Sequence, residues 1–311
     1  MGKARLTGKI SIGRPVTGRD MERRQTQFAL FLIIPSIIMI GLFIGYPLVY
    51  SFFLTFSKFT IQKVDWFAAG TSNYSLVFKD QTFWDALGFT LLYTMTYVVI
   101  SMALGLLVAV LLQQVTMGGS IFRGILFLPT VIPVTMGLLM FQWVLDPNNG
   151  VLNHVLLRVL NRPDLVHNWL TDETTAFGTL VTVTLWGFGP WILLLAGLLA
   201  IPKDFYEAAR VDGATRFGEF QHITLPLLRN TVMIVTTLQT IKALKLFVPI
   251  YVLTEGNPAG STRSLYYLVF QKINNGQNYY AYATTVGWIF AAIVLVISIL
   301  TTLIARQTRE R

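Results

Sequence analysis

The chain has 311 residues, of which 54% are apolar and only 13% are charged, and it contains no cysteine. An ordinary soluble domain has about 25% charged residues, so this composition excludes a soluble globular protein. The lack of cysteine excludes disulfides and thiolate metal sites. Apolar runs of about 18 residues or more recur along the chain, and each can cross a bilayer core of about 30 Å as a helix. The sequence therefore predicts an all-α, polytopic membrane helical bundle.

The formal net charge of +9 is partly concentrated at the N-terminus, ahead of the first apolar run. The basic residues there are Lys3, Arg5, Lys9, Arg14, Arg19, Arg23 and Arg24. A basic flank beside a spanning helix is typical of a topology signal and of attraction to anionic lipid. No aromatic residue lies between these charges, as a single-strand nucleic-acid binder would need. We expect residues 1–27 to form a basic cytoplasmic tail, with no nucleic-acid partner.

The apolar runs predict six transmembrane helices within one membrane domain, residues 28–305. The predicted spans are 28–50, 86–114, 122–145, 177–201, 231–253 and 282–305. Pro129 and Pro133 interrupt the third span, and Pro249 interrupts the fifth. Prolines are tolerated in membrane helices where neighbouring helices or water satisfy the freed carbonyl groups, so these spans belong in the interior of a bundle.

Orientation follows from the positive-inside rule. With both termini in the cytoplasm, the inner segments hold about twice as many Lys and Arg residues as the outer loops. We therefore expect residues 306–311 to be a cytoplasmic C-terminal end. The outer stretch Asn149–Trp169 mixes apolar residues with turn formers and predicts a short surface helix.

The most informative segment is the predicted cytoplasmic loop 202–230. Pro202 and Asp204 suit the start of a helix, and Gly213 supplies a turn. A second short amphipathic helix is expected next, and Leu225-Pro226 is expected to end it and turn the chain back to the membrane. An interfacial hairpin on lipid is the alternative, but such a helix is rich in Lys and Arg, whereas this loop mixes both signs of charge and better suits a protein groove.

The spacing of Glu207-Ala208-Ala209, Gly213 and Ile223-x-Leu225-Pro226 resembles the EAA loop of binding-protein-dependent ABC importer permeases. The resemblance implies the ABC importer type I permease fold, in which this loop is a coupling helix that docks in a groove of the ATPase subunit. Carried over to this chain, the ATPase-coupling residues are Glu207, Ala208, Ala209, Asp212, Gly213 and Pro226.

The resemblance covers about residues 28–305 and is closest to the carbohydrate branch, the maltose-type and glycerol-phosphate-type permeases. It rests on Asn73-Tyr74, Phe83-Trp84-Asp85-Ala86-Leu87, Phe127-Leu128-Pro129, Gly150-Val151-Leu152-Asn153 and the stretch 247–258. In that last stretch Val248, Pro249, Glu255 and Asn257 depart from the family pattern. The resemblance implies import of a sugar, an oligosaccharide or glycoside.

Lys242 and Lys245 lie in the predicted fifth span, where a lysine costs at least about 2.5–3.5 kcal/mol unless it meets water or a partner. They either snorkel and bond backbone or partner-subunit groups, or one of them binds substrate together with Gln239. Aromatic rings suit sugar faces, although tryptophans near helix ends are often interfacial anchors. The substrate-pathway candidates are Gln142, Trp143, Trp186, Trp191, Gln239, Lys242 and Lys245.

The chain has no G-x-x-x-x-G-K-[ST] phosphate loop, so it has no ATPase site of its own, and ATP and Mg are expected on partner subunits. Its histidines (His154, His167 and His222) have no ligand spacing, so we expect no metal site, no cofactor in this chain and no catalytic residues. The chain is thus a transporter subunit and not an enzyme.

Two alternatives remain. An ion-coupled secondary transporter would be expected to have an acidic residue within a span, and this chain has none there. An ABC importer permease for glycerol phosphate or another non-sugar solute is nearer, because the two lysines favour an anionic ligand. The expected partners are a second homologous permease, two ATPase subunits, an extracytoplasmic solute-binding protein, the sugar and the lipid of a bacterial inner membrane.

Overall fold

The computed structural model describes residues 18–59, 63–115, 117–187, 189–276 and 279–307, and it divides the chain into two compact units, 1–53 and 54–311. The helices α1 (Gly18–Ile40) and α2 (Tyr46–Leu54) are joined by the π-helical turn η1 (Gly41–Gly45). Helix α1 begins before the predicted boundary at Phe28, so that position marks no change in secondary structure. The rest of the predicted tail, residues 1–17, lies outside the described residues.

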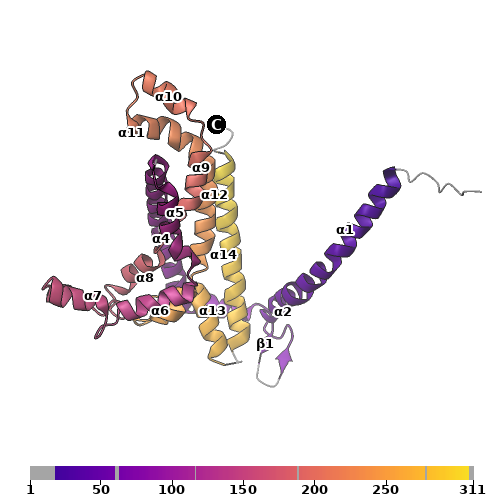
Figure 1. Cartoon of the computed structure of the whole chain (residues 1–311). Helices are drawn as coiled ribbons and strands as arrows, with labels where there is room; N and C mark the ends of the chain where they lie inside the picture. Colours follow the sequence, from indigo (N-terminus) through magenta and orange to yellow (C-terminus); the bar gives the residue numbers. More distant parts are fainter. Residues whose placement is uncertain (1–17, 60–62, 116, 188, 277–278, 308–311) are drawn as a thin grey trace, which may run out of the picture. The chain divides into compact units, whose positions relative to one another are not determined.

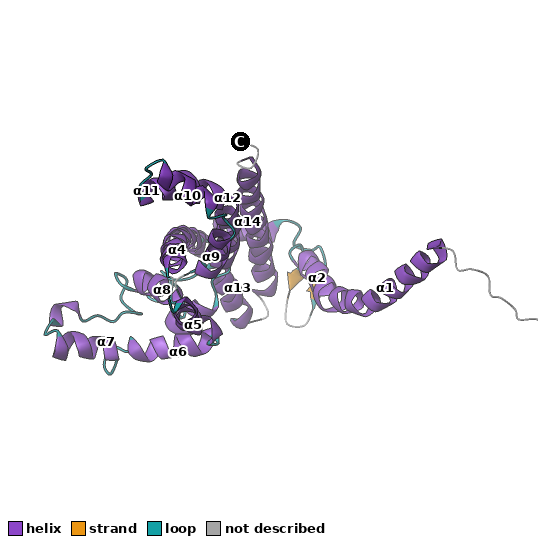
Figure 2. Ribbon diagram, turned by 45° about the horizontal axis from the view of Figure 1, so that its top comes forward, coloured by secondary structure: helices purple, strands orange, loops and turns teal. Residues whose placement is uncertain are grey.

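The second unit is built around three long helices, α4 (Gln81–Gln114), α12 (Leu225–Leu244) and α14 (Tyr280–Gln307), and both α4 and α14 pack on α12 (Figure 1). The connection from α9 (Trp191–Leu199) to α12 forms one end of this unit, and α13 (Leu265–Asn274) lies at the other end (Figure 2). The remaining helices are α3 (Ser72–Lys79), α5 (Gly119–Val131), α6 (Val134–Val144), α7 (Val151–His154), α8 (Ala176–Thr184), α10 (Asp204–Val211) and α11 (Arg216–Glu219). Short turns are η2 (Val155–Val159), η3 (Pro163–Leu165), η4 (Phe220–Thr224) and η5 (Ile250–Thr254), and β1 (Lys58–Phe59) pairs antiparallel with β2 (Val64–Asp65).

The predicted third span, 122–145, is not one straight helix. Helices α5 and α6 meet at a bend of 89°. Pro133 has no N–H to donate and pushes the preceding Ile132 out of the helical region, to φ −71° and ψ 128°. The break at Pro133 agrees with the expected interruption of this span, whereas Pro129 lies inside α5 and does not break it.

The predicted spans 177–201 and 231–253 are broken as well. Between α8 and α9 the chain passes through Gly187 and Gly189, both at positive φ, and through Pro190. Between α12 and η5 it leaves the helix before Pro249. Within the described residues three helical segments are long and apolar enough to cross a membrane, or four if the bent pair counts as one span, so the count of six stays a prediction.

The expected turn at Leu225-Pro226 is also wrong. Helix α11, the π-helical turn η4 and helix α12 run on as one helical stretch, and Pro226 lies in the first turn of α12. A π-turn accepts wider hydrogen-bond spacing, and the early helical position tolerates a residue without an N–H. The loop and the long helix are therefore continuous.

The core of the second unit is divided among three buried clusters. One joins α4, α9 and α12 through Leu194, Leu198 and Leu228, all fully buried. A Cβ atom added at Gly197 would lie 2.7–2.8 Å from side-chain atoms of Thr231 and Leu228, so this glycine lets α9 approach α12 closely. The other clusters lie around α8 and η5 and around α13 and α14. Close packing of α9 on α12 links the two ends of the unit.

Candidate functional site

Helices α10 and α11 form a compact pair that we call the α10–α11 unit, residues 202–224. Helix α10 ends in a Schellman motif, in which the N–H of Ala214 donates to the carbonyl of Ala209 and the N–H of Gly213 donates to that of Arg210. Gly213 has φ +80°, a left-handed conformation that glycine adopts without cost. Thr215 then caps α11 by accepting a hydrogen bond from the N–H of Gly218. The predicted helix–glycine–helix arrangement is confirmed.

Two side-chain contacts hold α10 against the following helical stretch. Arg210 Nε donates to Glu219 Oε1 at 2.8 Å, and this hydrogen bond raises the pKa of the guanidinium. The carboxylate of Glu219 is buried, with 9% of its side chain exposed. A second bond joins the hydroxyls of Tyr206 and Thr224 at 3.0 Å. These contacts fix α10 against α11 and η4, and the helical stretch continues from there into α12.

Three large apolar side chains of this unit are exposed. Phe205, Val211 and Phe217 are 52%, 89% and 73% exposed. The predicted coupling residues Glu207, Ala208, Asp212, Gly213 and Pro226 are also exposed, and Ala209 is half-buried. Exposed apolar side chains set among charged ones are typical of a surface that contacts another protein or a membrane.

The second candidate site is a cavity of about 530 Å³, which we call the central cavity. All three helix breaks contribute to its wall, through Ile132, Gly189 and Pro249. A broken helix leaves backbone polar groups without partners, and within a membrane these are tolerated only beside protein or a wet cavity. Substrate sites of membrane transporters are typically built at such discontinuous helices. Its volume falls in the range of about 300–1,000 Å³ of ligand pockets.

The structure brings three of the predicted substrate contacts together at this cavity. Lys242, Lys245 and Trp186 all line it. The ammonium of Lys242 lies 5.8 Å from the ring centroid of Tyr97, and the hydroxyl of Tyr97 also donates to Gln239 Oε1 at 3.5 Å. Gln239 therefore lies next to the cavity and contacts one of its wall residues.

The other predicted contacts lie elsewhere. Trp143 is 83% exposed, and neither it nor the exposed Gln142 lines the cavity. Trp191 is buried between α4, α9 and α12, where it packs as a core residue. Phe188, which lies between the candidates Trp186 and Trp191, is outside the described residues. Gln142, Trp143 and Trp191 are absent from the cavity wall because of the directions of α6 and α9, which residue spacing alone did not reveal.

Sequence reasoning missed the tyrosines of the cavity. Tyr93 and Tyr97 lie one turn apart on α4, with their rings stacked at 5.7 Å, and the hydroxyl of Tyr93 donates to Thr184 at 2.8 Å. Tyr266 of α13 also lines the cavity. Two tyrosines at i and i+4 in an otherwise apolar helix were the available signal, because each hydroxyl needs a polar partner in the membrane.

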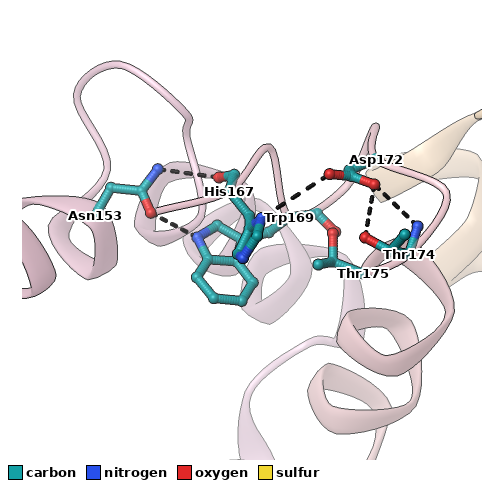
Figure 3. A network of polar contacts seen from close by, with 6 residues as sticks. All are labelled: Asn153, His167, Trp169, Asp172, Thr174 and Thr175. Atoms are coloured by element: carbon teal, nitrogen blue, oxygen red, sulfur yellow. Dashed lines mark hydrogen bonds and ion pairs between the residues drawn. The ribbon is translucent and has the colours of Figure 1, made fainter. Parts of the chain in front are cut away.

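A polar network fixes the loop that leads into α8 (Figure 3). Asn153 donates to the carbonyl of His167 at 3.1 Å and accepts from the indole of Trp169 at 2.7 Å. Asp172 accepts from the backbone N–H and the hydroxyl of Thr174 at 2.9 and 2.8 Å, and the backbone bond is the larger cause of its lowered pKa. The network fixes the start of α8, whose other end reaches the cavity. The predicted surface helix in this loop is confirmed by α7 and η2.

Comparison with known proteins agrees with this geometry. Residues 101–310 match the family model described as "Binding-protein-dependent transport system inner membrane component". The chain is 30% identical to the trehalose/maltose transport system permease protein MalF of Thermococcus litoralis over 292 residues, 93% of this chain and 97% of the relative. It is also 30% identical to the lactose transport system permease protein LacF of Rhizobium radiobacter over 284 residues, 89% of this chain and 93% of the relative.

A solved structure has the same fold. The crystal structure of a bacterial ABC transporter involved in the import of the acidic polysaccharide alginate aligns with a TM-score of 0.80 and 22% identity, covering 93% of this chain and 98% of that one. The chain is thus a multi-pass membrane component of a transport system and not an enzyme. The family match, which spans the α10–α11 unit and most of the broken helices, shows that this chain belongs to the binding-protein-dependent transport system inner membrane components, the permeases of ABC importers.

Proposed function

We propose that this permease moves a sugar into the cell and is driven, through the α10–α11 unit, by ATPase subunits that bind ATP and Mg. The observation that carries the proposal is the α10–α11 unit itself, an exposed apolar surface fixed by its own contacts and continuous with α12, a helix that reaches the central cavity. The similarity to relatives named for trehalose/maltose and lactose transport supports a sugar as the transported substrate.

The partners follow from the same reasoning. The full importer would contain a second permease, two ATPase subunits and an extracytoplasmic binding protein, and a solved alginate ABC transporter in complex with a periplasmic protein supports the last of these. The α10–α11 unit lies at the same end of the second unit as the C-terminal end of α14 (Figure 1). Docking of an ATPase there would place this end in the cytoplasm. The positive-inside rule favours the same side for the basic N-terminus.

Movement of the α10–α11 unit would act on the cavity through α9 and α12. Helix α12 continues directly from the unit, α9 is joined to it by the short link 200–203, and Gly197 lets α9 and α12 pack closely. A displacement by the ATPase would therefore reach Lys242 and Lys245 at the far end of α12, and Gly189 ahead of the start of α9.

The test is reconstitution of the complete importer in proteoliposomes with its binding protein outside and ATP inside. Labelled neutral and anionic saccharides should be offered, among them maltose, lactose and longer oligosaccharides, and those that are taken up should accumulate only when ATP is hydrolysed. Accumulation driven by a proton or sodium gradient in the absence of the ATPase subunits would overturn the proposal, because it would make the chain a secondary transporter.

A further inference from the structure

The central cavity contains two positive charges and no negative one. Lys242 and Lys245 both line it, and no Asp or Glu is among the residues of its wall. Among the described acidic residues, Asp65 lies in β2 and the others lie in loops, near helix ends or in the α10–α11 unit. Among the described residues neither lysine forms an ion pair within the chain. The wall of the cavity is therefore unbalanced in charge.

The two lysines are also close neighbours. They are three residues apart on α12 and its C-terminal cap, a spacing that places side chains on one face, about 5–6 Å apart at Cβ. Like charges at this spacing repel, and the repulsion is stronger where water is scarce. A bound anion between them would relieve the repulsion and form charge-assisted hydrogen bonds.

The rest of the wall suits a carbohydrate. Trp186 and Tyr266 are 40% and 45% exposed in the chain and line the cavity with their rings. Each is supported by a second ring, Trp186 edge-on by Phe141 at 5.2 Å and Tyr266 by Phe247 at 5.2 Å. Rigid rings of this kind present flat apolar faces to the C–H faces of a sugar.

We infer that the ligand of the central cavity is an anionic carbohydrate, a saccharide that carries carboxylate or phosphate groups, with Lys242 and Lys245 binding the charged groups while Trp186 and Tyr266 pack on the sugar ring. The inference rests on the proposed function, since it names the substrate class of the same importer. It separates this permease from one whose cavity serves neutral oligosaccharides.

The direct experiment measures equilibrium binding to the complete transporter in nanodiscs without its binding protein, so that selection by that protein does not enter. The probes are a linear trisaccharide of hexuronate residues with its carboxyl-reduced neutral counterpart, and a hexose 6-phosphate with the free hexose. We expect at least one charged probe to bind about tenfold or more tightly than its neutral counterpart, because hydrogen bonds to charged groups contribute about 1.5–3 kcal/mol. The two charged probes distinguish carboxylate from phosphate.

The variants assign the preference to this chain. The double substitution Lys242→Met, Lys245→Met should abolish the preference for the charged probe over its neutral counterpart. The arginine pair Lys242→Arg, Lys245→Arg should keep a preference for the anion. Lys79→Met is the matched control, because that lysine is exposed at the end of α3 and does not line the cavity.

Three results would overturn the inference: equal binding of charged and neutral probes, no binding of either charged probe, or a preference that survives in the methionine pair. If the methionine pair fails to assemble, the comparison of charged and neutral probes on the unmodified transporter still tests the inference. ATP-driven uptake of the neutral trisaccharide with undiminished affinity would overturn the inference while the proposed function stands. Uptake that needs no ATPase would overturn the proposed function independently.

Discussion

The α10–α11 unit takes all its residues from one continuous stretch, 202–224, whereas the central cavity takes its wall from six helices, α4, α5, α6, α8, α12 and α13, and from three helix breaks. The unit is organised by local hydrogen bonds at Gly213 and Thr215. The breaks lie next to Pro133, Pro190 and Pro249, and each contributes residues to the cavity wall. A surface of the first kind can be built locally, whereas a cavity inside a membrane bundle has to be assembled from segments far apart in the sequence.

The largest effect is expected where the two regions are connected. Gly197→Ala would place a methyl group 2.7–2.8 Å from Thr231 and Leu228 side-chain atoms and force α9 away from α12. Overpacking of this kind costs about 1–3 kcal/mol, more than the helical gain of alanine over glycine. Thermal unfolding of the purified permease in detergent should show the loss, together with loss of uptake. Gly287→Ala is the control, because nothing lies within 4 Å of a Cβ there, and equal stability of the two variants would refute the link.

The next effect isolates the α10–α11 unit. Gly213→Val places a β-branched residue at φ +80°, a strained conformation that costs about 1–3 kcal/mol and disturbs the end of α10. ATP-driven uptake should fall more than about tenfold while sugar binding to the transporter is unchanged. Uptake measured in proteoliposomes beside binding in nanodiscs separates the two. A parallel loss of binding would mean that the unit and the cavity are not distinct.

The reverse experiment isolates the cavity. Gly137→Ala would place a methyl group 2.9 Å from the ring of Trp186 and displace that ring. The apparent affinity for transported sugar should weaken about tenfold, the low end of what one methyl group does in a pocket. ATP hydrolysis stimulated by saturating sugar should be retained. Gly178→Ala, also helical but with open space around its Cβ, should change neither quantity.

The smallest effect concerns the network at Asp172, which belongs to neither region. The bond from the N–H of Thr174 lowers the pKa of Asp172 in the folded protein below the usual value of about 3.9. The sign follows from linkage: this contribution to stability is fully present above about pH 4 and is lost as the pH falls through the lower folded pKa. The hydrogen-exchange protection factors of residues 167–176, which correct for slower intrinsic exchange in acid, should therefore fall as the pH is lowered, and Asp172→Asn should remove that pH dependence. An unchanged pH profile in Asp172→Asn would show that another group titrates.

The same contrast explains what could be read from the sequence. The membrane bundle, the loop with its turn at Gly213, and the family followed from apolar runs and from one fixed spacing. The break at Pro133 was signalled, but its angle depends on contacts between α6 and η5 that no local pattern contains. Lys242 and Trp186 are far apart in sequence, and they line the same cavity because the helices that carry them are broken. Trp191, the first residue of α9 after Pro190, instead packs in the buried core. The prediction of a turn at Leu225-Pro226 was wrong because the π-helical turn η4 leads directly into α12, whose first turn tolerates the proline.

We propose that an ATPase subunit covers the α10–α11 unit, and the chain's lack of cysteine makes a direct test simple. Val211→Cys, at the most exposed apolar position of α10, would be labelled with a photoactivated cross-linker in the assembled importer in membranes. We expect Val211→Cys to form a cross-link to the ATPase subunit, with a yield that changes when ATP is bound. The control is Val159→Cys on η2, which is 73% exposed but lies outside the α10–α11 unit and should form no such cross-link. Cross-linking of Val211→Cys to lipid alone, with no polypeptide partner, would contradict the proposal.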